Sequence, residues 1–219
     1  MTEAFLDYTY YTILSACSLV ALYRFKSVNK ATRFLCLYIL YGLLSEILSY
    51  HSSITFGNNY LVYNLYDYLT LILLSIFFYL SISSRKSRMV ILSVFVALIL
   101  LLMLNLIYFP SFNAIHQHNI EFIYSFSIII LSLYSIYRMV LKDKNATIYN
   151  NPLFWTAMVF VFYKFINIWG KAAVYYPFQT GLERDKDYFH FILLGNNIIL
   201  YAVLGIVLWL YPKMKENGR

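Results

Sequence analysis

The amino-acid sequence predicts an all-α fold, a polytopic membrane protein built as a seven-transmembrane-helix bundle. Composition supports this fold class, because 61% of the 219 residues are hydrophobic and 12% are charged, unlike a soluble globular domain. The chain also contains seven apolar runs, most of them close to the roughly 20 residues that cross a hydrocarbon core of about 30 Å. Finally, the basic residues gather in alternate connections between these runs.

The apolar runs define the predicted helices in chain order. They span approximately residues 6–23, 34–50, 60–82, 89–108, 120–141, 153–176 and 188–211, and the second, with 17 residues, is the shortest. Glu3 and Asp7 stand at the start of the first run in place of a basic segment, so we expect a retained helix there and no cleaved signal peptide. The connections are short, which predicts a single transmembrane domain over residues 1–219.

The distribution of basic residues predicts the orientation of the bundle. Thirteen of the 17 Lys and Arg residues lie in or close to the first, third and fifth connections or in the C-terminal tail. These segments share one side of the membrane if the helices alternate in direction, and Lys and Arg accumulate on the cytoplasmic side. The pattern therefore predicts an N-terminus outside and a C-terminus in the cytoplasm. It also assigns the net charge of +7 to contacts with membrane lipids, and no nucleic-acid partner is expected.

Charged and amide side chains inside the predicted helices concentrate toward the outer side. The predicted pocket residues are Glu46, Asn64, Asp67, Glu121, Lys164, Asn167, Lys171, His190 and Asn197. Lys164, Asn167 and Lys171 share a helix face at about 100° per residue, and a lysine at the bilayer centre costs about 2.5–3.5 kcal/mol. We therefore expect that face to lie inside the bundle.

Depth in the membrane suggests two partnerships, Lys171 with Glu46 or Asp67, and Asn167 with Asn197. Two interpretations of this polar set remain open. It can form a pocket that opens to the outside, or its members can serve as pairs that hold helices together.

The histidines raise the question of a metal. All four lie on the predicted outer side, and His116, His118 and His190 could bind zinc together with Asp187 or Glu121. Ordinary surface histidines are the alternative interpretation, and no other cofactor is predicted. The sequence contains no Gly-rich phosphate loop, nucleophile elbow or metalloprotease helix, so no reaction is predicted and enzymatic activity stays open.

Several short segments carry a family resemblance. They are SEILSY at 45–50, NNYLVYNLYDYL at 58–69, NPLFW at 151–155 and GNNIIL at 195–200. In these segments the sequence resembles a family of uncharacterised seven-helix inner-membrane proteins of Gram-negative bacteria. The resemblance covers most of the chain. It implies the seven-helix topology and a place in the bacterial inner membrane, and it implies no activity.

Three classes of function follow from these observations. The predicted function is a ligand-sensing or signalling module for a small anionic or zwitterionic molecule, acting through a protein partner because the cytoplasmic connections are too short for an output domain. The first alternative is a transporter or a pore-forming accessory protein, alone or as a homo-oligomer, such as small proteins that accompany defence systems. The second is an intramembrane enzyme that modifies a lipid headgroup, with Glu46, Asp67 or His190 in acid–base roles.

Overall fold

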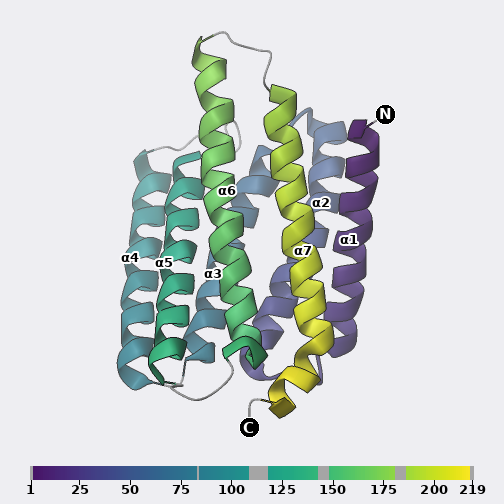
Figure 1. Ribbon diagram of the computed structural model, residues 1–219. Coiled ribbons are helices and arrows are strands. Elements are labelled where there is room, and N and C mark those ends of the chain that lie inside the picture. The colour runs from purple at the N-terminus through teal and green to yellow at the C-terminus, as the bar shows by residue number, and fades with distance from the viewer. Residues whose placement is uncertain (1, 83, 109–117, 143–147, 181–185, 218–219) are drawn as a thin grey trace. The chain divides into compact units, whose positions relative to one another are not determined.

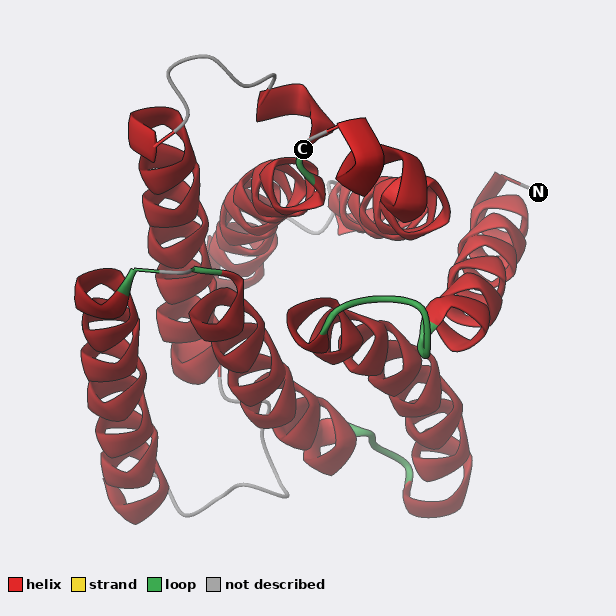
Figure 2. Ribbon diagram, turned by 90° about the horizontal axis from the view of Figure 1, so that it is seen from below, coloured by secondary structure: helices red, strands yellow, loops and turns green. Residues whose placement is uncertain are grey.

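The computed structural model describes residues 2–82, 84–108, 118–142, 148–180 and 186–217, and in them the chain is helical apart from its connections (Figures 1 and 2). The elements are α1 (Thr2–Arg24), α2 (Lys30–Phe56), α3 (Tyr60–Ser81), α4 (Arg85–Tyr108), α5 (His118–Lys142), the short 3-10 helix η1 (Ile148–Asn150), α6 (Pro152–Thr180) and α7 (Lys186–Asn217). Within the described ranges, seven helices are long and apolar enough to span a membrane. This confirms the predicted all-α class and the presence of seven helices long and apolar enough to span a membrane. The orientation of the helices in a membrane stays a prediction.

One predicted length is wrong, because α2 has 27 residues and is not the shortest helix. Its start is set by Asn29, whose side chain accepts a hydrogen bond from the Thr32 backbone N–H at 2.9 Å. Its end is set by Gly57, which adopts the left-handed conformation (φ 72°) and donates its backbone N–H to the Ser53 carbonyl. The polar residues before Gly57 are helical because the caps, and not apolar side chains alone, determine where a helix ends.

The chain forms two compact units, residues 1–20 with 132–219 (unit 1) and residues 21–131 (unit 2). In unit 1, α6 and α7 pack side by side as antiparallel neighbours (Figure 1). The start of α1 runs parallel to α7, since Tyr10 lies near Tyr201 with ring centroids 6.2 Å apart and Cys17 lies beside Gly205. A Cβ atom at Gly205 would be 3.5 Å from the Cys17 Sγ atom, so the two helices are in close contact there.

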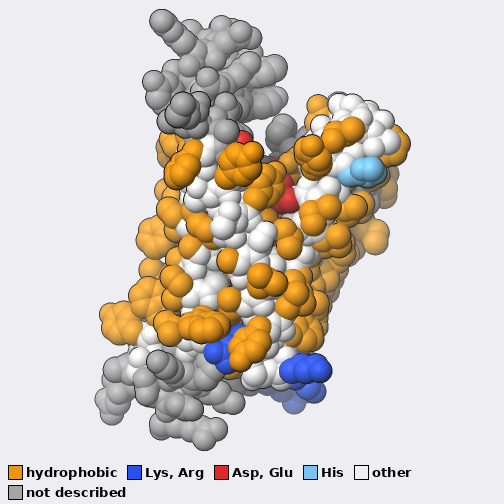
Figure 3. Space-filling view, turned by 90° about the vertical axis from the view of Figure 1, so that its right-hand side faces the viewer, with side chains coloured by type: hydrophobic (Ala, Val, Ile, Leu, Met, Phe, Trp, Pro, Cys, Tyr) orange, Lys and Arg blue, Asp and Glu red, His pale blue; other side chains and the backbone are white. Residues whose placement is uncertain are grey.

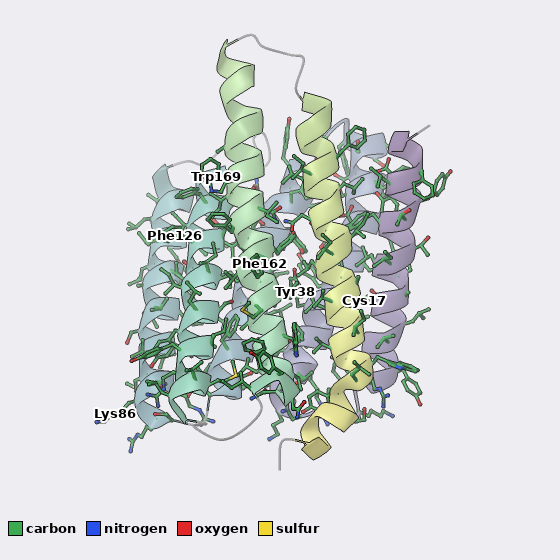
Figure 4. The ribbon with its side chains drawn as sticks, in the orientation of Figure 1. Cys17, Tyr38, Lys86, Phe126, Phe162 and Trp169 are labelled. Carbon is green, nitrogen blue, oxygen red and sulfur yellow. The ribbon has the colours of Figure 1, made fainter. Side chains whose placement is uncertain are left out.

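Unit 2 is organised around α2 and α3. The Tyr41 ring stacks on the Tyr66 ring with centroids 5.6 Å apart, and the Asn59 side chain reaches Ser49, so the two helices run antiparallel. Helix α4 packs on α3. Tyr38, labelled in Figure 4, is fully buried.

The outward surface is apolar where lipid would surround it. Hydrophobic side chains predominate on the face drawn in Figure 3, and Lys and Arg side chains gather at its lower end. Phe126, Phe162 and Trp169, labelled in Figure 4, are more than half exposed on their helices. Such a distribution suits helices whose outer faces meet hydrocarbon and whose ends meet headgroups.

Candidate functional site

Helix α6 carries the most deeply buried cation described in the chain. Asn151 caps the helix by accepting the Leu153 N–H at 3.0 Å, and Pro152 follows at the first helical position, where its missing N–H costs nothing. Lys164 and Asn167, three residues apart, then share a face and are 3% and 6% exposed. The prediction that this face lies inside is confirmed for these two residues. The backbone of Lys171 continues α6, but its side chain lies outside the described residues.

An asparagine of α7 bridges to this face. The Asn196 side-chain N–H donates to the Tyr163 carbonyl at 2.8 Å and to the Asn167 Oδ1 atom at 3.1 Å. Both asparagines are buried, so the two bonds join α6 to α7 away from water. We call Lys164, Asn167 and Asn196, with the Tyr163 carbonyl, the α6–α7 polar cluster.

The prediction that Asn167 pairs with Asn197 is wrong by one residue, because the side chain that donates to Asn167 is that of Asn196. Asn196 stands four residues before the fully buried Leu200, which is followed one turn later by the fully buried Leu204. These positions lie on one helix face, but the spacing could not have identified Asn196 from the sequence, because Asn197 likewise stands four residues before a buried residue, Tyr201. Asn197 is half-buried on the neighbouring face.

Lys164 is stabilised in part by an aromatic neighbour. Its Nζ atom lies 5.1 Å from the centroid of the Tyr163 ring, within the range of a cation–π interaction. An ammonium group so well shielded from solvent requires electrostatic partners, and the ring is one of them. The cluster thus combines a cation with amide groups that can donate and accept hydrogen bonds.

A close helix contact lies about one turn from the cluster. Gly170 faces Leu193, and a Cβ atom at Gly170 would come within 2.7 Å of the Leu193 Cδ2 atom. A side chain at position 170 would therefore require the Leu193 side chain to move. The absence of a side chain at Gly170 thus leaves room for Leu193 of α7 to pack against α6.

The acidic residues of the predicted pocket, together with Asn64, belong to unit 2. Asn64 and Asp67 on α3 are 1% and 6% exposed, and Glu121 on α5 is 8% exposed, so all three side chains are buried. Glu46 on α2 is half-buried. It stays a prediction that these residues share a pocket with the α6–α7 polar cluster. The pairing of Lys171 with an acidic residue also stays a prediction.

The zinc hypothesis is also untested. In the part of the chain that the structure describes, no three His, Cys, Asp or Glu residues are grouped to hold a metal. The side chains of His116, His118 and His190 lie outside that part.

Comparison with protein-family models, curated proteins and solved structures finds no match to this chain. The resemblance to seven-helix inner-membrane proteins therefore stays a prediction.

Proposed function

We propose that this is a multi-pass protein of a bacterial inner membrane, with its N-terminus outside, that senses a small anionic or zwitterionic ligand and signals through a partner protein. Seven helices suited to spanning a membrane support the multi-pass part. The basic residues in alternate connections support the orientation.

One observation carries the ligand-binding part, the burial of Lys164 beside Asn167 in the middle of a membrane-spanning helix. Lys164 stands 12 residues after Pro152, roughly 18 Å along the helix axis. A lysine stem cannot easily reach the interface from that depth. Ionisable residues at such positions are costly to keep in a membrane and are commonly functional.

The chemistry of the cluster favours an anionic group on the ligand. The Lys164 ammonium supplies charge, and the Asn167 amide nitrogen can donate because its Oδ1 atom already accepts from Asn196. A carboxylate or a phosphate would fit such a pair of donors. Both donors stand on α6, so a ligand bound to them is positioned by one rigid element.

The bridge to α7 provides a route for signalling. A ligand that draws the Asn167 amide toward itself would change the Asn167–Asn196 bond and with it the contact between α6 and α7. The ligand then favours whichever helix arrangement binds it better. The described connections after α1, α2 and α3 are a few residues long, so the output needs a separate protein.

The test compares two lysine substitutions in the full-length protein purified in mild detergent. Lys164→Met removes the buried charge and retains the length of the side chain, whereas Lys86→Met makes the same change at an exposed position. Inorganic phosphate, succinate and glutamate serve as probes, and thermal unfolding with and without each probe reports binding.

We expect at least one probe to raise the unfolding temperature of the wild type and of Lys86→Met but not of Lys164→Met. A folded Lys164→Met protein with unchanged probe responses would contradict the proposal, and so would a wild type that none of the probes stabilises. In either case the cluster would serve only to hold α6 against α7.

The buried acids of unit 2 favour a second candidate, a proton- or cation-coupled transporter. Asp67 and Glu121 both lie inside helices suited to span the membrane, where carboxylates commonly mark ion pathways. Proton uptake into liposomes containing Asp67→Asn, compared with the wild type, tests this candidate. Equal uptake by both proteins and by empty liposomes would contradict it.

A further inference from the structure

One end of unit 2 is strongly basic. All seven Lys and Arg residues of positions 21–131 fall in two short segments, and they are Arg24, Lys26, Lys30, Arg33, Arg85, Lys86 and Arg88. The first segment joins α1 to α2 and the second opens α4. Because α2 and α3 are antiparallel and α4 begins directly after α3, the two segments lie at the same end of the unit, which we call the basic end.

In the first segment, two arginines are held in place by aromatic neighbours. The Arg33 Cζ atom lies 6.0 Å from the Phe25 ring centroid, and its Nη2 atom donates to the Lys26 carbonyl at 3.4 Å. The Arg24 Cζ atom lies 5.3 Å from the centroid of the Tyr23 ring. These contacts help to orient the two guanidinium groups.

The second segment repeats the arrangement. The Arg88 Nε atom donates to the Ile82 carbonyl at 2.6 Å, and its Cζ atom lies 5.7 Å from the Tyr79 ring centroid. Arg85 and Lys86, in the same turn, are exposed. Both segments thus pair an oriented guanidinium with exposed cations.

Neither basic segment contains an acidic residue of its own. The acids of residues 21–131 are Glu46, Asp67 and Glu121, and none stands in either basic segment. The basic end also coincides with the ends of membrane-spanning helices, which is the depth of lipid headgroups. An anion that meets these arginines from outside the chain would be found at that depth.

We propose that the basic end of unit 2 binds the phosphate of an anionic phospholipid. Arg24, Arg33 and Arg88 are the specific ligands, and the lysines add electrostatic attraction. A guanidinium presents its N–H groups in a planar fork that matches two phosphate oxygens, whereas a lysine acts as a point charge. The contacts with aromatic rings and carbonyl groups hold the guanidinium groups in one orientation before the lipid binds. This lowers the conformational entropy that is lost on binding.

The experiment separates this site from diffuse attraction between a basic surface and an acidic membrane. Native mass spectrometry of the full-length protein in neutral detergent measures binding of phosphatidylglycerol and, for comparison, phosphatidylcholine with the same acyl chains. Two triple variants remove equal charge, Arg24→Gln/Arg33→Gln/Arg88→Gln and Lys26→Gln/Lys30→Gln/Lys86→Gln.

We expect the wild type to prefer phosphatidylglycerol, and the arginine variant to lose about tenfold or more of that preference. The lysine variant should lose about threefold or less, because its oriented forks remain. Equal losses in the two variants would overturn the site in favour of diffuse attraction. A wild type without preference would overturn it altogether.

A conservative variant keeps the test decisive if the arginine triple variant does not fold. Arg33→Lys retains the charge and removes the fork, so we expect it to weaken phosphatidylglycerol binding by about threefold or more. Unchanged binding by a folded Arg33→Lys protein would overturn the role assigned to this arginine.

Discussion

The pairs α6–α7 and α2–α3 are both antiparallel neighbours, and they offer two polar contacts at different depths for comparison. In α6–α7, Asn196 bonds to the Tyr163 carbonyl and to Asn167 within the spans. The second contact lies at the connection of α2 and α3, where Asn59 donates to Ser49 at 3.0 Å and Ser52 donates to the Asn58 carbonyl at 2.9 Å.

The difference in depth determines what can replace a lost bond. Water reaches the connection of α2 and α3, where Gly57 is exposed, so a lost bond there can be exchanged for a bond to solvent. No such exchange is available to a polar group inside a hydrocarbon core. Substitutions in the middle of α6–α7 should therefore destabilise the protein more than substitutions at the α2–α3 connection.

The largest effect is expected at Gly170. Gly170→Leu would force a side chain into the space of Leu193, and we expect the free energy of unfolding to fall by about 1–3 kcal/mol. Gly195→Leu is the matched control, because no atom lies within 4 Å of a Cβ atom built there. Loss of helical circular dichroism during titration with sodium dodecyl sulfate measures both. Equal destabilisation of the two variants would show that the close approach at Gly170 does not limit stability.

A smaller effect is expected at the bridge. Asn196→Ala removes both interhelical bonds, and we expect a loss of about 1–2 kcal/mol in the free energy of unfolding. The adjacent Asn197→Ala changes the same chemistry at a half-buried position and should cost less. The same detergent titration applies. If Asn197→Ala proved the more damaging change, Asn196 would not be the residue that joins α6 to α7.

The smallest effect is expected at the α2–α3 connection. Gly57 adopts φ 72°, which costs a residue with a Cβ atom about 1 kcal/mol, so Gly57→Ala should destabilise by roughly that amount. Gly57→Asn should destabilise less, because asparagine tolerates the left-handed region. Thermal unfolding of the three proteins compares them. Alanine and asparagine variants of equal stability would indicate that conformation at Gly57 is not the limiting factor.

The sequence by itself determined the helical class and the seven spans. Backbone groups in lipid must bond within their own segment, so a long apolar run has few structures open to it besides a helix. The same reasoning missed both ends of α2, because counting apolar residues overlooks polar residues that remain helical up to a cap such as Asn29 or Gly57. It did identify the buried face of Lys164 and Asn167, since periodicity is a local property.

Only the tertiary structure decided which residues meet. Asn196 and Asn197 are adjacent in sequence and identical in chemistry, and they differ by about 100° around the axis of α7. The rotation that turns Asn196 toward α6 depends on how the two helices pack, including the contact between Gly170 and Leu193. Packing between helices depends on side chains distant in sequence, and for this reason the identity of the bridging residue was not available from the pattern of α7 alone.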